Sequence, residues 1–402
     1  MNKKIYLAHY AQSNFGKLGE ITVDEMIQAA ISEGLEKLDR KKIDFVTLAA
    51  LLAPLLNGQS LVSGIVAMDP DFVMKPIKTV ENACASGSEA VLDVTARILA
   101  GLGHVGLAIG LEKMNEPDRK TDSKKVGLAL GTAAHMGERF DPFSFPHLFA
   151  LLMRDYINEY GATEEQFANI SVLFYKNASF NPLAHMFKTR APVTVEAVMN
   201  SYRLFQEPEV LPLKLFDCSQ ISDGWARILV MDDEGLEIMG IPKQECTLLA
   251  GFGQATDTLA LNARGKYLLK PLGARKAFND AMEMAGTKIE DVKVQEIHDC
   301  FNVMGPLAVE TTGLAEPGQG LKYFLEGQAE VGARCPINTS GGLIAKGHPI
   351  SATGLAMIGW NHWQILGKVP PEVQVKNADV ATTLNIGGPI CATAVTVQQP
   401  AG

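Results

Sequence analysis

Val80-Glu81-Asn82-Ala83-Cys84-Ala85-Ser86-Gly87-Ser88-Glu89-Ala90 places a cysteine where an extended segment turns into a helix. Residues 77–80 precede it as a short strand-like segment, and residues 90–100 follow with apolar side chains at helical spacing. Free backbone N–H groups and the positive end of the helix dipole favour a thiolate at such a junction. The pattern predicts a nucleophile at Cys84, although a buried, inert cysteine is the more common outcome for this residue type.

Length and composition set limits on the fold and on the ligands. A chain of 402 residues is long enough for two domain-sized units. Its 47% hydrophobic and 20% charged content is that of an ordinary globular protein. A formal net charge of −9 argues against a general nucleic-acid-binding surface. An anionic ligand would therefore need a local basic patch or helix N-termini.

The cysteines and apolar runs indicate the compartment. The six cysteines lie at positions 84, 218, 246, 300, 335 and 391 with no CxxC pair, which argues against a disulfide framework and against a zinc ribbon, so no metal ligand is assigned. The N-terminus has no apolar run long enough for a signal peptide. The longest apolar run, residues 45–56, contains Pro54 and is too short to span a bilayer. We expect a cytoplasmic protein that does not enter the membrane.

The order of predicted elements indicates an α/β fold. Residues 4–8, 44–49, 104–110 and 228–231 read as strands, and helical patterns cover residues 22–38 and 90–100 between them. This alternation predicts a mostly parallel sheet with helices on both faces. From residue 115 to about 212 the composition changes: the sequence becomes charged, aromatic and proline-rich, with helical patterns at 148–160 and 163–178. This segment is interpreted as a loop domain inserted over the sheet.

A second unit of the same kind starts near Cys246. A helix at 275–286, a strand at 292–298, a glycine-rich loop, a helix at 355–365 and a strand at 380–384 repeat the order of the first unit. The sequence therefore predicts two similar halves that face each other. The N-terminal half is assigned to residues 1–245, with the loop domain at about 115–212 inserted, and the C-terminal half to residues 246–402.

Three segments of the second half add reactive groups. Glu296-Ile297-His298-Asp299-Cys300-Phe301 ends a strand, where the active-site loops of open sheets lie. Gly341-Gly342-Leu343-Ile344-Ala345-Lys346-Gly347-His348-Pro349 is a glycine-rich loop that carries a second histidine. Asn385-Ile386-Gly387-Gly388-Pro389 ends a strand with glycine N–H groups free to face a ligand. Each segment alone is more often structural, but together they offer Cys84 a base and oxyanion donors.

These segments resemble the thiolases. The resemblance is carried by residues 83–87, Gly110-Leu111-Glu112-Lys113-Met114, His298-Asp299-Cys300-Phe301 and residues 338–349, in the expected order from about residue 40 to 397. It is closest to the sterol-carrier-protein-type branch, which has the His-Asp-Cys-Phe motif. The resemblance implies a five-layer αβαβα sandwich and Claisen-type cleavage or formation of a C–C bond in β-ketoacyl-coenzyme A thioesters. Coenzyme A is then a co-substrate, and no tightly bound cofactor is expected.

The resemblance also implies roles for single residues. Cys84 matches the nucleophile that carries the acyl group, and His348 the residue that activates it. His298 matches the group that holds the thioester oxygen. Gly387, with the Cys84 backbone N–H, matches a second oxyanion hole, and Ser219 a serine beside the pantetheine arm.

The acid/base position departs from the common pattern. Many thiolases place a catalytic cysteine before the final glycines, where this chain has Asn385. In the His-Asp-Cys-Phe branch the motif's own cysteine takes that role, so it is assigned to Cys300, with Cys391 as the rival. Arg227 departs from the small residues usual at its position, and a structural ion pair is expected for it rather than a substrate contact.

Substrate and partners stay open at this level. Phe143, Phe145, Leu148 and Phe149 either line a chamber for a bulky or aromatic acyl group or form the core of the insertion. Members of the family are commonly homodimers or dimers of dimers. Two-component members such as benzoylsuccinyl-CoA thiolase act with a small OB-fold, zinc-binding partner subunit. The alternatives are a related acyltransferase or condensing enzyme that uses Cys84 without thiolysis, and a non-catalytic subunit of a complex.

Overall fold

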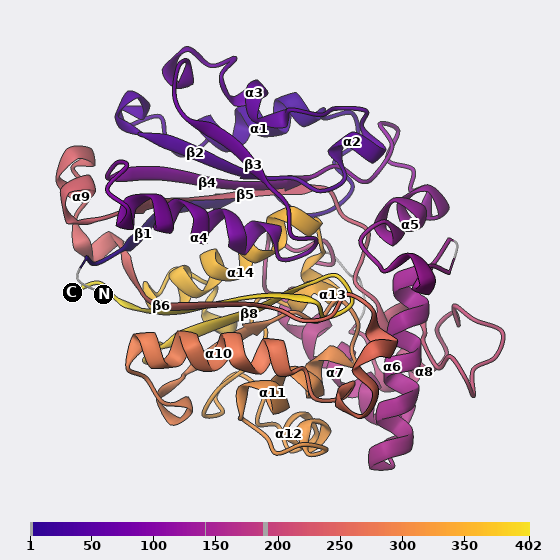
Figure 1. Cartoon of the computed structure of the whole chain (residues 1–402). Coiled ribbons are helices and arrows are strands. Elements are labelled where there is room, and N and C mark those ends of the chain that lie inside the picture. Colours follow the sequence, from indigo (N-terminus) through magenta and orange to yellow (C-terminus); the bar gives the residue numbers. More distant parts are fainter. Residues whose placement is uncertain (1–2, 141, 188–191) are drawn as a thin grey trace.

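The computed structural model describes residues 3–140, 142–187 and 192–402, and its elements stack in five layers (Figure 1). Helices α1 (Val23–Ser32) and α3 (Val62–Val66) form one outer layer. Helices α10 (Leu272–Ala285) and α11 (Met304–Thr312) form the opposite outer layer. Two layers of strands lie between them, and α4 (Ser86–Leu99) and α14 (Ile350–Ile365) fill the middle. The expected αβαβα sandwich is confirmed.

The strands of the N-terminal half lie in the order β3-β2-β4-β5-β1. Their bounds are Tyr6–Gln12 for β1, Phe45–Ala49 for β2, Ile77–Val80 for β3, Val105–Glu112 for β4 and Gly224–Met231 for β5. Strand β2 is parallel to β3 and β4, whereas β5 is antiparallel to β4 and β1. Every residue of β2, β4 and β5 is buried, because helices cover both faces of this layer.

The C-terminal half repeats this pattern with the order β6-β9-β8-β7. Its strands are β6 (Thr247–Thr256), β7 (Val294–Ile297), β8 (Ala381–Gly387) and β9 (Ala392–Pro400). Strand β7 is parallel to β8, as β2 is to β4. Strand β9 is antiparallel to β8 and β6, as β5 is to β4 and β1. The predicted internal repeat is therefore present in the topology.

Two features of the sheets differ from expectation. The two halves share one nine-stranded sheet within the described residues, because Tyr6 and Leu7 of β1 pair with Leu248 and Thr247 of β6. The prediction of a mostly parallel sheet is wrong, because most neighbouring strand pairs are antiparallel. Helical crossovers produce parallel neighbours, but β8 and β9 are joined by the short turn 388–391, which can only connect antiparallel strands.

Helix α14 is the centre of the molecule. From Ile350 to His362 every residue is buried, so the helix has no solvent-facing side. It packs against α4, and the two backbones approach so closely that a Cβ on Gly87 would lie 2.6 Å from the Ser351 carbonyl oxygen. Glycine at position 87 allows this contact, which brings the N-termini of the two helices together.

The inserted segment is helical and covers one end of the strands. It contains α5 (Ser123–Gly131), α6 (Ser144–Tyr160), α7 (Glu164–Ala178) and α8 (Val195–Met199). Thr163 caps α7 in a capping box with Gln166. Leu148 and Phe149 are buried in the core of this segment, and Phe149 stacks on Phe301 with ring centroids 4.5 Å apart. Residues 141 and 188–191 of the segment lie outside the described residues.

The remaining helices are short: α2 (Ala53–Leu56), α9 (Asp233–Met239), α12 (Gly320–Leu325) and α13 (Gly342–Lys346). One local prediction is wrong. Helix α1 ends at Ser32 instead of residue 38, because Gly34 adopts a positive φ of 73°. In the described part of the chain, no helix combines the length and hydropathy needed to cross a membrane.

Candidate active site

Cys84 lies in a strained turn between β3 and α4. Ala83 has a positive φ of 48°, an unfavourable conformation for a residue with a Cβ. The Ser86 hydroxyl holds the turn by donating to the Ala83 carbonyl at 2.6 Å and accepting the Asn82 N–H at 2.8 Å. The side chain of Cys84 is only 8% exposed. The turn therefore fixes the direction of the sulfur before any ligand binds.

The glycines after β8 bring a backbone donor to this sulfur. A Cβ on Gly387 would lie 2.3 Å from the Asn82 carbonyl oxygen, so only glycine fits against the Cys84 turn. The N–H of the next residue, Gly388, donates to the Cys84 sulfur and lowers its pKa.

The two predicted histidines meet at Cys84. The sulfur and one ring nitrogen each of His298 and His348 all lie within 4.8 Å of one another. The two imidazole rings are nearly perpendicular, at 84°, with centroids 5.2 Å apart. His298 follows β7 and His348 precedes α14, so residues more than 200 positions from Cys84 converge on it.

Hydrogen bonds fix which nitrogen of His348 carries its proton. Nδ1 of His348 lies 2.7 Å from the Thr353 hydroxyl oxygen. That hydroxyl donates its own hydrogen to the Pro349 carbonyl at 3.0 Å, so it can only accept from the ring. Nδ1 of His348 is therefore protonated, and its Nε2 has a free lone pair that can take a proton from a thiol.

His298 has the opposite tautomer. The amide nitrogen of Asn385 lies 3.1 Å from the Cys84 carbonyl oxygen and 3.1 Å from Nδ1 of His298. A carbonyl oxygen only accepts, which fixes the amide orientation, and the Ser88 hydroxyl donates to the amide oxygen at 2.9 Å. Nδ1 of His298 must then accept a hydrogen bond. Its Nε2 carries the hydrogen and can donate to an oxyanion.

Burial keeps all three groups neutral in the free protein. Burial raises the pKa of Cys84 to about 12, and the nearby Glu112 carboxylate adds to this. Burial lowers the pKa of His348 to about 3, and it lowers the pKa of His298 well below its usual value. The expectation of a thiolate stabilised by the helix dipole is therefore wrong for the free protein. Loss of solvation outweighs the dipole, so the thiol must lose its proton during the reaction.

Cys300 lies close enough to Cys84 for their charges to interact. It is 7% exposed, and burial raises the pKa of its thiol well above the usual value, to which the repulsion between two neighbouring thiolates at Cys84 and Cys300 would add. A near-neutral pKa for this thiol, expected from its assigned role, is therefore absent in the free protein. Cys391 lies in the turn between β8 and β9, and its thiol donates to the Asp257 carbonyl at 3.0 Å.

Ser219 lies beside Cys300 at the insertion. Its backbone N–H donates to the Cys300 carbonyl at 2.8 Å, and its side chain is half-buried. Phe301 pairs with Cys218 across an isolated bridge, so the two predicted segments run side by side. The structure thus brings Cys84, His298, Cys300, His348 and Gly387 together, with Ser219 next to Cys300.

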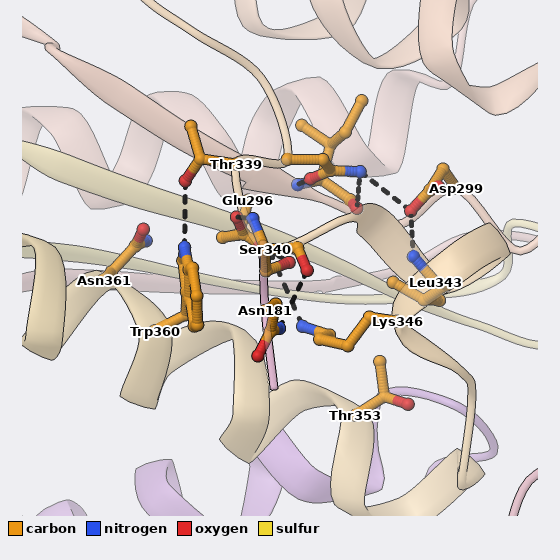
Figure 2. A network of polar contacts seen from close by, with 12 residues as sticks. Asn181, Glu296, Asp299, Thr339, Ser340, Leu343, Lys346, Thr353, Trp360 and Asn361 are labelled. Atoms are coloured by element: carbon orange, nitrogen blue, oxygen red, sulfur yellow. Dashed lines mark hydrogen bonds and ion pairs between the residues drawn. The ribbon is translucent and has the colours of Figure 1, made fainter. Parts of the chain in front are cut away.

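A buried polar network anchors the two histidine-bearing segments to each other (Figure 2). Asn338 donates to Asp299 at 2.8 Å and bonds both backbone groups of Ile297, and Asp299 accepts the Leu343 N–H at 2.7 Å. Glu296 accepts the Ser340 N–H at 3.1 Å and pairs with the fully buried Lys346 at 3.6 Å. These bonds fix the separation between His298 and His348.

Sequence reasoning missed several residues that position the histidines. The Ser222 hydroxyl accepts the backbone N–H of His348 at 3.2 Å and also contacts Nδ1 of His185 at 2.8 Å. Thr353 lies one turn into α14, where a threonine reads as an ordinary helix residue. In the sequence, its position five residues after His348 is the only indication that the two side chains could be near each other. The fold shows that they are in contact.

The cysteine and the two histidines are also ligand types that bind zinc. Their ligand atoms lie within 4.8 Å of one another. A tetrahedral zinc ion would require them to move closer together, because Zn–N and Zn–S bonds are about 2.0–2.3 Å long. Arg227 takes no part in the site: it is 1% exposed and donates to the Glu33 carbonyl after α1.

Family models and relatives agree with this geometry. A model described as the thiolase N-terminal domain matches residues 5–234, and a thiolase C-terminal domain-like model matches residues 253–399. The chain belongs to the thiolase family.

Three relatives show the range of similar proteins. The chain is 34% identical over 382 residues to an acetyl-CoA acetyltransferase of Methanothermobacter thermautotrophicus, with 94% of both chains covered. It is 28% identical to benzoylsuccinyl-CoA thiolase subunit BbsB of Thauera aromatica, with 96% of both chains covered. It is 30% identical to human sterol carrier protein 2, over 78% of this chain and 56% of that protein. These relatives confirm the predicted family, branch and acyltransferase class.

A solved structure shows the same fold. The structure titled "Ltp2-ChsH2(DUF35) aldolase" superimposes with a TM-score of 0.78, covers 99% of this chain and 98% of that chain, and is 19% identical in sequence.

Proposed function

We propose that this protein is a thiolase in which Cys84 carries the acyl group of a β-ketoacyl-coenzyme A. The observation that carries the proposal is the meeting of the Cys84 sulfur with two histidines of opposite tautomer. A free lone pair on His348 and an N–H on His298 are the base and the oxyanion donor that acyl transfer to a thiol needs.

The first half-reaction forms the acyl-enzyme. Nε2 of His348 takes the thiol proton as the Cys84 sulfur attacks the ketone carbon. The Cα–Cβ bond breaks, and its electron pair becomes the enolate of the departing thioester. The Nε2–H of His298 donates to the enolate oxygen. The Gly388 N–H, which already contacts the sulfur, lies where it can stabilise the oxyanion on the attacked carbon together with the Cys84 N–H.

Cys300 completes the proton balance. Its thiol protonates the enolate carbon, and the resulting acetyl-coenzyme A leaves, while the shortened acyl group stays on Cys84. The resulting Cys300 thiolate takes the thiol proton of a second coenzyme A, which attacks the acyl group on Cys84. The departing Cys84 thiolate regains its proton from the His348 imidazolium. The electrostatic contact with Cys84 favours Cys300 in this role over Cys391, whose thiol is bound to Asp257.

The remaining site assignments follow the same geometry. Ser219 is proposed as a contact of the pantetheine arm, because it borders Cys300 at the half-buried rim of the site. Leu148 and Phe149 lie in the core of the insertion, which supports their structural role over an aromatic acyl chamber. Six free cysteines support a reducing compartment, and we propose the cytoplasm.

We also propose a homodimer that pairs through β3. This strand lies at one edge of the sheet, and the exposed apolar residues Val73 and Met74 lie a few residues before it. An unpaired edge with apolar neighbours is a template for a second copy of the same strand. A further OB-fold, zinc-binding subunit is proposed because one relative is named as a subunit and the similar structure's title names two components.

Intact-mass measurement of the acyl-enzyme tests the proposed function. Acetoacetyl-coenzyme A is expected to leave an acetyl group on wild-type protein, and added coenzyme A to remove it. Cys84→Ala is expected to abolish both the adduct and turnover. Cys246→Ala is the matched control, because Cys246 is a buried cysteine bonded to the Pro242 carbonyl away from the site.

The other outcomes discriminate between the alternatives. An adduct that coenzyme A fails to release would favour a condensing enzyme. Full turnover in Cys84→Ala would overturn the proposal. Absence of any adduct in wild-type protein, with the purified zinc-binding partner present as well as absent, would favour a non-catalytic subunit.

A further inference from the structure

A cavity lies directly behind the Cys84 site. It has a volume of about 430 Å³, is open to solvent on one side, and is lined by the start of α1, the end of α2, the start of α5 and residues 113–117 after β4. Helices α2 and α5 are neighbours in Figure 1. The cavity walls include Leu56, Met114 and Val126.

The same three side chains belong to the apolar cluster around Cys84. That cluster contains Cys84, Met114 and Val126 among its buried members, with Leu56 packed against it. Met114 is 6% exposed and Val126 is 1% exposed. The apolar cluster that contains the nucleophile therefore also forms part of the cavity wall.

Within this cluster the backbone at Met114 is fixed while its side chain is adaptable. The buried Asp223 carboxylate accepts the N–H groups of Met114 and Asn115 at 2.7 and 2.8 Å and pairs with Lys113 at 2.9 Å. Ser222, the preceding residue, accepts the His348 N–H. A methionine side chain is unbranched and fits many shapes, so it can turn aside without disturbing this framework.

We propose that this cavity is the outer part of the acyl-binding site and that Met114 sets the acyl length that reaches it. The inference rests on the proposed role of Cys84 as the acyl carrier. An acyl chain on Cys84 runs past Leu56, Met114 and Val126, and a chain of medium length extends into the cavity.

The charges around the cavity define the chemical class of the acyl group. Glu20, Asp24 and Asp122 contribute to its lining. Both lysines of the lining are neutralised by ion pairs, Lys113 with Asp223 and Lys125 with Glu116, each at 2.9 Å. The cavity therefore has a negative surplus, which disfavours an acyl group with a terminal carboxylate. The ligand is an uncharged linear or branched acyl chain.

Two substitutions at Met114 with opposite effects test the proposal. Met114→Ala opens the wall and Met114→Trp fills it, while Met284→Ala on α10 controls for the loss of a methionine at an exposed position. The measurement is kcat/KM for 3-ketobutanoyl-, 3-ketohexanoyl- and 3-ketodecanoyl-coenzyme A, and for the ω-carboxy analogue of the six-carbon substrate.

The expected result is a change in the ratio between long and short substrates. A buried methylene is worth about fourfold in binding, so Met114→Ala should raise the ten-carbon to four-carbon ratio by about tenfold or more, and Met114→Trp should lower it. The ω-carboxy substrate should be cleaved more slowly than its uncharged analogue. The proposal is overturned if both variants cleave the four-carbon substrate normally and neither changes this ratio by more than about twofold. Burial of even one methylene would change the ratio by more than that.

A second measurement does not depend on thiolysis. Alkyl methanethiosulfonates from methyl to octyl convert the Cys84 thiol to a mixed disulfide, with methanesulfinate as the leaving group, and mass spectrometry gives each rate. Relative to the methyl reagent, the octyl reagent should react faster in Met114→Ala and slower in Met114→Trp. If the rates show this pattern but no acyl adduct forms, the cavity is the chain-binding site and the thiolase mechanism is rejected. If four-carbon cleavage is normal but the pattern is missing, the thiolase mechanism stands and the role of the cavity is rejected.

Discussion

At the scale of single residues, two polar side chains give the two histidines different chemistry. Both rings are buried and neutral, and both lie at the same sulfur. Thr353 accepts from His348, whereas Asn385 donates to His298. An imidazole with one hydrogen can be a base or a donor at a given nitrogen but not both, so the partner on Nδ1 decides the role of Nε2.

Asn385→Asp is expected to reverse the tautomer of His298. A carboxylate accepts from Nδ1, which moves the hydrogen off Nε2 and removes an oxyanion donor. Loss of one such donor costs about 10²–10³ in kcat. The ¹⁵N shifts of His298 report the tautomer directly. Alkylation of Cys84 by iodoacetamide should stay near the wild-type rate, since His348 is untouched. An equal fall in kcat and in the alkylation rate would contradict the role assigned to His298.

Thr353→Val is expected to act on the other histidine. Without an acceptor for Nδ1, the hydrogen of His348 distributes over both nitrogens, and Cys84 is deprotonated less often. Both acylation and iodoacetamide alkylation should slow by about tenfold, within the range of general-base contributions, and Thr353→Ser should restore them. Thr95→Val is the control, because the buried Thr95 hydroxyl on α4 has no hydrogen-bond partner. Equal effects of both valine variants would argue for a general packing defect.

At the scale of elements, α14 connects the site with the far end of the molecule. Its first turn carries Thr353, and Ser351 donates to Glu112 of β4 at 2.8 Å. Its last turn carries His362, whose Nδ1 lies 2.9 Å from the Thr247 hydroxyl at the start of β6. Because the helix is buried on all sides, its polar side chains need partners within the protein.

His362 should make stability depend on pH. Burial lowers its pKa to about 3, so below pH 6.5 the unfolded chain binds a proton that the folded chain does not. Stability is therefore lost as the pH falls from 6.5 toward 3, by about 1.4 kcal/mol per pH unit for this group. His362→Gln removes this loss, whatever its own cost at neutral pH.

Urea unfolding of wild type and His362→Gln at pH 7.5, 6.5 and 5.5 measures the effect. Below pH 6.5, wild type should lose unfolding free energy relative to His362→Gln. Above pH 6.5, the difference between the two proteins should stay constant. His135→Gln, at an exposed position, is the control. A difference that stays constant across the three pH values would show that His362 takes up a proton in the folded state.

At the scale of the whole molecule, two repeats enclose one layer of helices. Apolar residues of α4 and α14 form a single core with strands of both halves. The division at residue 245 stays a prediction: the family matches end at 234 and resume at 253. The same applies to the bounds of 115 and 212 for the loop domain.

The proposed dimer belongs to this scale. Met74→Asp combined with Thr79→Asp places two charges at the β3 edge, where both residues are exposed. Light scattering after gel filtration should show wild type at about twice the chain mass of 43.3 kDa and the variant at the chain mass. Leu102→Asp, at an exposed apolar position after α4, should leave the mass unchanged. A variant that stays dimeric would place the interface elsewhere.

Local sequence was enough to predict most elements, because their signals act over short range. The helical spacing after Cys84, the helical pattern at 163–178 and the apolar run of β4 all correspond to elements in the structure. Errors arose where long-range pairing decided the outcome. The direction of β5 and β9 depends on which strand lies beside them, and no local pattern records this.

The sequence by itself determined the family, the repeat and the reactive residue types, since these depend on the identity and order of side chains. Only the tertiary structure decided what state those side chains are in. Burial makes Cys84 a neutral thiol despite its place at a helix start, because desolvation outweighs the helix dipole. Thr353 and Asn385 assign the histidine protons, because hydrogen-bond partners are set by contacts in space and not by spacing along the chain.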